Sequence, residues 1–193
     1  IAPKHLAGAV RREGGLAVPI GAGNAWCAVL ETRLPGSDVP VYLLEHDRLY
    51  ARGYLYDPKN GWAADNMIRF AVLSRAAFAL SRALAWAPDV IHAHDWPTAL
   101  VPVYANSVER TRAATVLTIH NLAHQGVFPT DDFAATHVPW ELFRGDGLED
   151  RGNVNLLKGG LYHATMLTTV SPRYAREIRG TEHGAGLEHV LQF

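Results

Sequence analysis

Two clusters in the sequence combine residue types that can carry chemistry. The first is His92-Ala93-His94-Asp95-Trp96, and the second runs from Thr118 to Gly126. A carboxylate such as that of Asp95 can bind sugar hydroxyls or stabilise a developing positive charge. His120 and Asn121, when a strand holds them rigidly, can hydrogen-bond a sugar or a leaving group at little cost in ordering entropy.

Each cluster also has a purely structural interpretation. Asp95 can cap the helix expected after it, and His92 and His94 can fill the strand end by donating to backbone carbonyls. His120 can equally be a buried histidine that the backbone satisfies. A zinc site is a further interpretation, because imidazole and carboxylate are zinc ligands, but only His120 is well placed to add a ligand to the first cluster.

Three other motifs carry weaker signals. Lys158-Gly159-Gly160-Leu161 has the residue types of a phosphate loop, but it lies in a helical context ahead of a strand, whereas a phosphate loop follows a strand and opens a helix. Its two glycines are expected to allow close helix packing. The run from Gly21 to Gly23 lacks the dinucleotide-binding spacing. Ser171 has no nearby histidine and acid in triad order, which argues against a nucleophilic serine.

Aromatic residues gather in one polar loop and could stack on sugar rings. They are Tyr50, Tyr54, Tyr56 and Trp62. The alternative is that these side chains anchor the loop to the core, which is the commoner arrangement.

Strands are expected first along the chain, followed by a long helix. Short apolar runs bounded by turn residues predict strands over residues 16–20, 26–32 and 39–44. A helix is expected over residues 66–86, with Asp65 as its N-cap and Pro88 as its stop. Its apolar residues occupy more than one face, so this helix should be packed on more than one side.

The rest of the chain alternates strands with helices. The pattern predicts strands over residues 90–94, 115–120 and 166–170, and helices over residues 97–107, 153–163 and 172–178. Such alternation is typical of βαβ units, so the fold class is α/β with a Rossmann-like parallel sheet and flanking helices. Ligands of such sheets bind beyond the carboxyl ends of the strands. We therefore expect His94-Asp95, His120-Asn121 and Ser171 to converge.

Composition limits the class of protein. Hydrophobic residues make up 48% and charged residues 19% of the 193 residues, which suffices for a buried core and excludes an intrinsically disordered chain. The net charge of −1 argues against a nucleic-acid partner, and no apolar stretch is long enough for a membrane helix. A single cysteine, Cys27, fits a reducing compartment, so a cytoplasmic protein is expected. The chain begins with Ile1 and ends without a stop signal, so we expect both ends to be cut.

Blocks of sequence from about Leu34 to Gln192 follow one another in an order that is specific to one family. They are Leu34-Pro35-Gly36-Ser37, Val39-Pro40-Val41-Tyr42-Leu43, Asp65-Asn66 with Arg69-Phe70, residues 88–96, residues 118–123 with Gln125-Gly126, Leu157-Lys158 with Gly160-Leu161, residues 168–172 with 174–178, and Gly184 with Gly186-Leu187-Glu188 and Leu191-Gln192. In this order they resemble the bacterial and plant-type glycogen and starch synthases, which use ADP-glucose.

The resemblance implies a two-domain GT-B glycosyltransferase of the retaining class. Such an enzyme moves glucose from ADP-glucose to the non-reducing end of an α-1,4-glucan, with ADP-glucose as a co-substrate and no cofactor or metal. Residues 1–193 would be most of the N-terminal Rossmann-like half, without its first strand and Lys-x-Gly-Gly-Leu loop and without the C-terminal half. The motif at Lys158 copies that loop superficially but aligns to a different helix, so the role of the loop's lysine is not transferred to it.

Site residues follow from the same resemblance. Asp95 resembles the family's active-site aspartate, and His120 resembles the histidine that contacts the transferred glucose. Asn121 and Gln125 lie in the same sugar-side loop, and Tyr56 matches an acceptor-contacting tyrosine. The sequence departs from the family pattern at two places: His124 stands where the family usually has Tyr, and Pro97-Thr98-Ala99 stands where it usually has His-Ala-Gly.

Two other functions remain open from the sequence. One is a non-catalytic glucan-binding module that uses Tyr54, Tyr56 and Trp62. The other is a zinc hydrolase that uses His92, His94 and His120. If the chain is instead a synthase fragment, we expect it to be inactive without the missing half.

Overall fold

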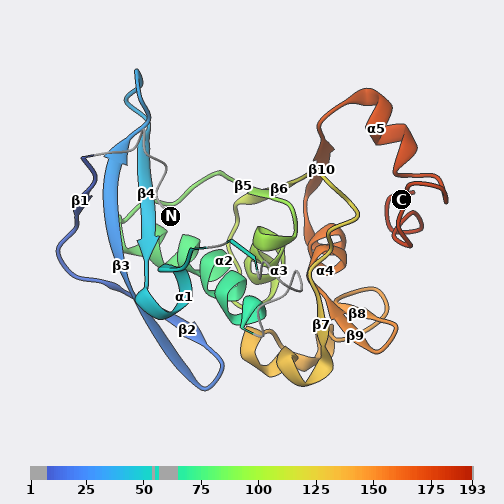
Figure 1. Cartoon of the computed structure of the whole chain (residues 1–193), viewed down its shortest axis with the longest axis horizontal. Helices are drawn as coiled ribbons and strands as arrows, with labels where there is room; N and C mark the ends of the chain where they lie inside the picture. The colour runs from blue at the N-terminus through green and yellow to red at the C-terminus, as the bar shows by residue number, and fades with distance from the viewer. Residues whose placement is uncertain (1–7, 54, 57–64, 193) are drawn as a thin grey trace.

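A long helix separates two regions of different architecture. The computed structural model describes residues 8–53, 55–56 and 65–192. Figure 1 shows an antiparallel sheet on one side of helix α2 (Asn66–Ala83) and a parallel sheet with its own helices on the other. Within the described ranges, no helix has the length and apolar character needed to cross a bilayer.

The N-terminal region is an antiparallel sheet. It consists of β1 (Val10–Arg11), β2 (Leu16–Ile20), β3 (Gly23–Arg33) and β4 (Pro40–Glu45), and β3 pairs with each of the others. The three strands expected here are confirmed. Their short connecting turns allow only antiparallel neighbours, because a parallel pair needs a long crossover. The short helix α1 (Asp47–Tyr50) follows β4.

Helix α2 belongs to the cores of both regions. Val72 and Ala76 pack with buried side chains of the antiparallel sheet, whereas Phe70 and Phe78 pack with the parallel region. The expectation of a helix packed on more than one side is therefore confirmed. The helix ends at Ala83 rather than at residue 86, because Ala85 adopts φ 50°, which ends the helix before the proline.

The expected N-cap of this helix is corrected in one respect. Asp65 occupies the N-cap position, but its side chain caps no backbone N–H. Its carboxylate instead forms an ion pair with Arg52, whose Nη1 lies 2.9 Å from Asp65 Oδ1. This pair lowers the pKa of the Asp65 carboxyl and connects the loop after α1 to the start of α2.

The second region contains the predicted parallel sheet. It consists of β5 (Val90–His94), β6 (Ala114–Ile119) and β10 (Met166–Thr169) in the order β10-β6-β5, all parallel. The helices α3 (Leu100–Ser107), α4 (Leu156–His163) and α5 (Pro172–Glu177) alternate with these strands, as expected. The helix predicted over residues 97–107 is divided into the 3-10 turn η2 (Trp96–Thr98) and α3.

A small third sheet was not expected from the sequence. It consists of β7 (Val127–Pro129), β8 (Glu149–Asp150) and β9 (Asn153–Asn155), with the 3-10 helices η3 (Thr130–Thr136) and η4 (Trp140–Leu142) between β7 and β8. The helix predicted over residues 153–163 therefore starts only at Leu156. Residues 153–155 pair as a strand, and the Asn155 side chain caps α4 by accepting a hydrogen bond from Lys158 N at 3.0 Å.

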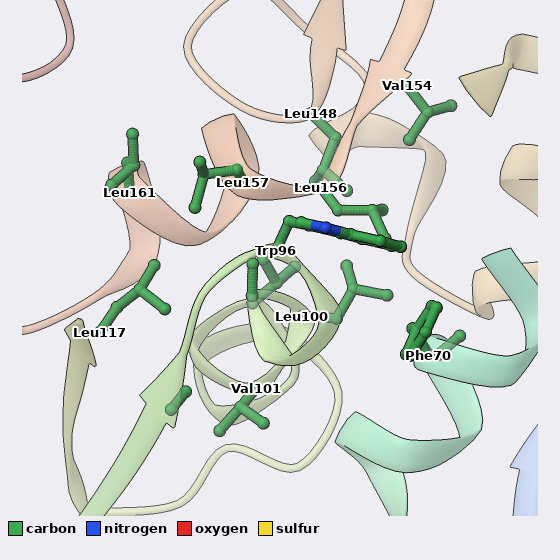
Figure 2. Close-up of a cluster of buried hydrophobic side chains, with 14 of the residues drawn as sticks. Phe70, Trp96, Leu100, Val101, Leu117, Leu148, Val154, Leu156, Leu157 and Leu161 are labelled. Atoms are coloured by element: carbon green, nitrogen blue, oxygen red, sulfur yellow. The ribbon is translucent and has the colours of Figure 1, made fainter. Parts of the chain in front are cut away.

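Trp96 lies at the centre of the second core. Figure 2 shows its indole among Phe70 of α2, Leu100 of α3, Leu156 of α4 and Leu148, which precedes β8. The paired glycines of α4 allow this close packing, as predicted, because a Cβ at Gly160 would lie 2.6 Å from the Ala99 carbonyl oxygen. Lys158 is buried and its Nζ donates to the Glu149 carbonyl at 2.6 Å, in keeping with the rejection of a phosphate loop.

Candidate active site at the ends of the parallel strands

Asp95 joins the ends of two neighbouring strands. It directly follows β5, and its Oδ1 accepts hydrogen bonds from the backbone N–H groups of His120 at 2.7 Å and Asn121 at 3.3 Å, directly after β6. Asp95 is the N-cap residue of η2 but makes no side-chain cap bond there, so the interpretation of this aspartate as a helix cap is wrong. The carboxylate instead fixes the β6 end relative to the β5 end.

The backbone of Asp95 is strained. Its φ of 55° and ψ of −175° lie in a region that residues with a side chain rarely adopt. Such a conformation costs on the order of 1–3 kcal/mol and persists only where surrounding contacts hold it. Here those contacts are the two bonds to Oδ1 and the bond from Asp95 N to the Thr118 carbonyl at 2.9 Å.

Three histidines form a row beside this aspartate. His94 Nδ1 lies 3.1 Å from His120 Nε2, and the rings of His92 and His94 have centroids 4.3 Å apart. His92 Nε2 lies 2.6 Å from Thr118 Oγ1. His94 and His120 thus bond to each other instead of surrounding a common centre. In the described part of the chain, no three His, Cys, Asp or Glu side chains are arranged to hold a metal ion, which disfavours the zinc interpretation.

A cavity of about 430 Å³ opens at the same end of the sheet. Its walls are formed by side chains of both sequence clusters, by the proline that follows the first cluster and by one aromatic residue of the predicted loop. They are Tyr56, His94, Asp95, Trp96, Pro97, Asn121 and His124. Asp95 and Asn121 therefore line one pocket, as the sequence predicts, whereas the His120 side chain is not part of its wall and reaches it through His94. His124 lies on the wall, and so does Pro97, the first residue of the other departure from the family pattern.

Tyr56 is held in this wall by aromatic packing. Its ring lies 5.4 Å from the Trp96 ring and 5.9 Å from the Phe70 ring. Burial, together with the nearby charge of Asp95, raises the pKa of the Tyr56 hydroxyl, so the hydroxyl stays protonated at neutral pH. Tyr50 was expected in the same loop, but it is the last residue of α1, and its hydroxyl donates to the Arg69 carbonyl at 2.7 Å. This bond anchors α1 to α2. Tyr54 and Trp62 lie outside the described residues.

His94 is partly desolvated at the cavity wall, and neighbouring side chains also act on its pKa. Desolvation is the largest cause, the neighbouring imidazoles of His92 and His120 add to it and Asp95 opposes it, so that the pKa of His94 is lowered from its ordinary value. His94 is consequently neutral at pH 7. A neutral imidazole presents one donor and one acceptor nitrogen.

The loop after β6 is anchored by partners from several segments. Leu122 N donates to the Tyr174 hydroxyl of α5 at 2.9 Å, and the carbonyls of Gln125 and Gly126 accept from the first residues of α4, Leu157 N and Leu156 N, each at 3.0 Å. These bonds leave the side chain of His124 free to face the cavity.

Gln125 contributes to this anchoring with its side chain. Its Nε2 donates to the Ala185 carbonyl at 3.0 Å and its Oε1 accepts from Asn155 Nδ2 at 2.7 Å. Both polar atoms are thus bonded within the protein, and Gln125 is not part of the cavity wall. Ser171, the third expected strand end, has its Oγ bonded to Tyr174 N at 3.1 Å as the cap of α5.

One functional candidate was missed in the sequence, and another was given no part in the sugar site. His94 was expected at the strand end beside Asp95, and the structure places it on the cavity wall in contact with His120. Tyr174 supports the loop after β6 from 52 residues further along the chain, and no local pattern indicates that contact.

Comparison with known proteins identifies the family. Residues 3–193 match the family model described as the starch synthase catalytic domain. Glycogen synthase 1 of Geobacter sulfurreducens is 50% identical over 191 residues, which cover 96% of this chain and 38% of that protein. Glycogen synthase of Treponema denticola is 40% identical over 188 residues, which cover 93% of this chain and 38% of that protein.

A solved structure agrees with these relatives. The catalytic domain of starch synthase IV from Arabidopsis thaliana, bound to ADP and acarbose, superposes with a TM-score of 0.85 at 27% identity and covers 96% of this chain and 38% of that chain. The present chain thus spans less than half the length of the relatives it matches. Its sequence, its fold and the polar ends of its parallel strands agree, and the chain belongs to the starch synthase catalytic domain family.

Proposed function

We propose that the protein carrying this chain transfers glucose from ADP-glucose to the non-reducing end of an α-1,4-glucan with retention of the anomeric configuration. Membership of the starch synthase family supports this reaction, as do curated relatives named glycogen synthase. The similar structure bound to ADP and acarbose supports a nucleotide sugar and a glucan as its two substrates. Residues 1–193 form part of the N-terminal half in this proposal.

The observation that carries the proposal is the linkage between Asp95 and the end of β6. It brings a carboxylate, an asparagine and two histidines to one edge of the parallel sheet, where ligands of such sheets bind. The cavity beside it has the mixed aromatic and polar wall that suits a sugar, whose ring stacks on aromatic faces and whose hydroxyls need hydrogen bonds.

The reaction exchanges one bond at the anomeric carbon. The bond from C1 of glucose to the β-phosphate oxygen of ADP breaks, and a bond from C1 to the O4 atom of the acceptor forms on the same face. The proton of the acceptor hydroxyl passes to the departing phosphate oxygen. Positive charge develops on the sugar ring in an oxocarbenium-like transition state, so fixed carboxylate and imidazole dipoles lower the barrier by position and electrostatics.

Each site residue has a distinct part in this proposal. Asp95 fixes the geometry of the site with Oδ1 and supplies negative charge near the sugar, and His120 polarises the sugar. Asn121 and Tyr56 contact substrate from the cavity wall. Gln125 is assigned to holding the loop instead of binding substrate, since both of its polar atoms are engaged within the protein.

Segments outside residues 1–193 complete the cleft in this proposal. They would contact ADP and neutralise its charge as it departs, so the 193-residue piece by itself is expected to be inactive. No cofactor or metal is required, and addition of a chelator such as EDTA should leave the rate of the complete protein unchanged. A cytoplasmic location remains a prediction that cell fractionation tests.

The direct test is a transfer assay with the complete gene product. Purified protein is incubated with radiolabelled ADP-glucose and glycogen, and label in the precipitated polymer is counted over time. We expect label to accumulate with ADP-glucose and to be released by α-1,4-specific hydrolysis. A protein that binds maltooligosaccharides but transfers no label would instead be a glucan-binding module, and the proposed reaction would be wrong.

A further inference from the structure

His94 is placed between the cavity and the histidine assigned to the sugar. Its ring lines the cavity, and its Nδ1 lies 3.1 Å from Nε2 of His120. The two rings have centroids 5.3 Å apart and are tilted by 48°, so this is an edge contact between two ring nitrogens. Among the described residues, none is hydrogen-bonded to the other ring nitrogen of His120, Nδ1, and the proposed function assigns this nitrogen to the substrate.

We propose that His94 is a positioning residue that fixes the ring orientation and the tautomer of His120. This inference rests on the proposed function, because it specifies how the histidine assigned to the transferred glucose is prepared for its contact.

The surroundings of His94 leave it little freedom. Its backbone N–H donates to Thr98 Oγ1 at 2.6 Å, and the same hydroxyl donates to the His94 carbonyl at 2.7 Å. The rings of His92 and His94 lie next to each other, with a centroid distance of 4.3 Å. His92 is held in turn by Thr118, whose Oγ1 lies 2.7 Å from Thr168 Oγ1. A chain of contacts from β10 across β6 to β5 thus fixes the position of His94.

The contact with His94 restricts which ring nitrogen of His120 can carry its proton. One of the two facing nitrogens must donate and the other must accept, since two bare nitrogens or two N–H groups would repel. If His94 donates, His120 carries its proton on Nδ1 and offers a donor to the sugar; if His94 accepts, His120 offers an acceptor there. In both cases the tautomer of His120 is tied to the tautomer of His94. Without His94, both tautomers and a rotated ring become accessible.

Three substitutions at His94 distinguish the effect of its Nδ1 atom on His120 from the effect of its side-chain volume. In His94→Ala the facing nitrogen is lost, whereas in His94→Asn a side-chain amide atom occupies the position of Nδ1. In His94→Gln the amide lies further out, near the former Nε2. We expect kcat of the complete protein to fall about tenfold to a hundredfold in the alanine and glutamine variants, with KM for ADP-glucose within about twofold of wild type.

Rescue by asparagine is the decisive comparison. We expect His94→Asn to recover most of the lost kcat, because it restores a partner for His120 Nε2. His183→Ala is the matched control for loss of a histidine, since this side chain is 51% exposed and lies in the segment after α5; its kcat should equal that of wild type. An alanine variant with unchanged kcat, or an asparagine variant no better than glutamine, would overturn the proposal.

A second measurement does not depend on turnover. Long-range ¹H–¹⁵N spectra of the histidine rings report which nitrogen of His120 carries the proton. We expect one dominant tautomer in wild type and His94→Asn and a mixture in His94→Ala, and an unchanged tautomer in the alanine variant contradicts the inference. A wild-type protein without transfer activity but with this tautomer shift would refute only the proposed function.

Discussion

The antiparallel and the parallel regions of this molecule differ in what their strand ends can do. In the antiparallel sheet, neighbouring strands run in opposite directions, so residues that follow two neighbouring strands lie at opposite ends of the sheet. In the parallel sheet, β5, β6 and β10 all end at one edge, which brings together residues that are far apart in sequence. The candidate site lies at this edge, and the difference shows that strand direction decides where a site can be assembled.

Helix α2 packs against both regions, so the stability of each region depends on the other. It contributes buried side chains to both cores, and its Phe70 touches both Trp96 and Tyr56 at the cavity. The antiparallel sheet therefore supports the site without supplying a residue to its wall. Substitutions should consequently separate into those that change turnover and those that change stability, according to region.

The largest effect is expected at Asp95. Replacement Asp95→Ala removes the acceptor for two backbone N–H groups and the charge near the sugar, so kcat/KM should fall at least about a hundredfold. Initial rates of label transfer measure this loss. The variant Asp95→Asn keeps an acceptor oxygen without the charge and should lose less, which separates the structural from the electrostatic part. Near-normal turnover in both variants would remove Asp95 from the site.

A core substitution in the antiparallel sheet should lower stability and leave substrate binding unchanged. Val18 is fully buried at 0% exposure in β2, so Val18→Ala should lower the free energy of unfolding by about 2 kcal/mol through lost apolar contact and a cavity. The KM for ADP-glucose should not change while the protein remains folded. Urea unfolding and initial rates test both statements. Trp26→Ala, at a side chain that is 70% exposed, is the control and should change stability by less than about 0.5 kcal/mol.

The smallest effect is expected from His163, at the end of α4. Burial and the charge of Arg144 lower the pKa of His163 in the folded protein, so the unfolded chain binds more protons below about pH 6.5. The free energy of unfolding should therefore fall as the pH is lowered from 7 to 5. His163→Asn should make this fall smaller and leave stability at pH 7 to 8 little changed. Equal slopes in wild type and variant would show that His163 does not contribute.

Elements with a strong local pattern could be predicted from the sequence. The strand over residues 16–20 and the alternation from residue 90 onward were found because apolar periods and turn residues mark them directly. The convergence of Asp95 and Asn121 followed from one topological rule for parallel sheets. The likeness to the synthases added the family and the expected role of each residue.

Features that depend on distant partners could not be predicted. Residues 153–155 form a strand only because β7 and β8 lie beside them, and no local signal distinguishes them from the first turn of α4. The side chain of Gln125 is turned toward Asn155 and Ala185, which lie 30 and 60 residues away in the sequence. Asp95 satisfies the backbone of another strand rather than that of its own turn, and only tertiary structure makes that choice.

The loop after β6 is held in place mainly by hydrogen bonds to its main chain. Its N–H groups are bound by Asp95 and Tyr174, and its later carbonyls by the start of α4. Because the frame is independent of the side chain at His124, that position can vary during evolution while the loop keeps its shape. In the proposed reaction, the side chain at this position could change the fit of the acceptor glucan while the bonds that hold Asp95, His120 and Asn121 together stay in place.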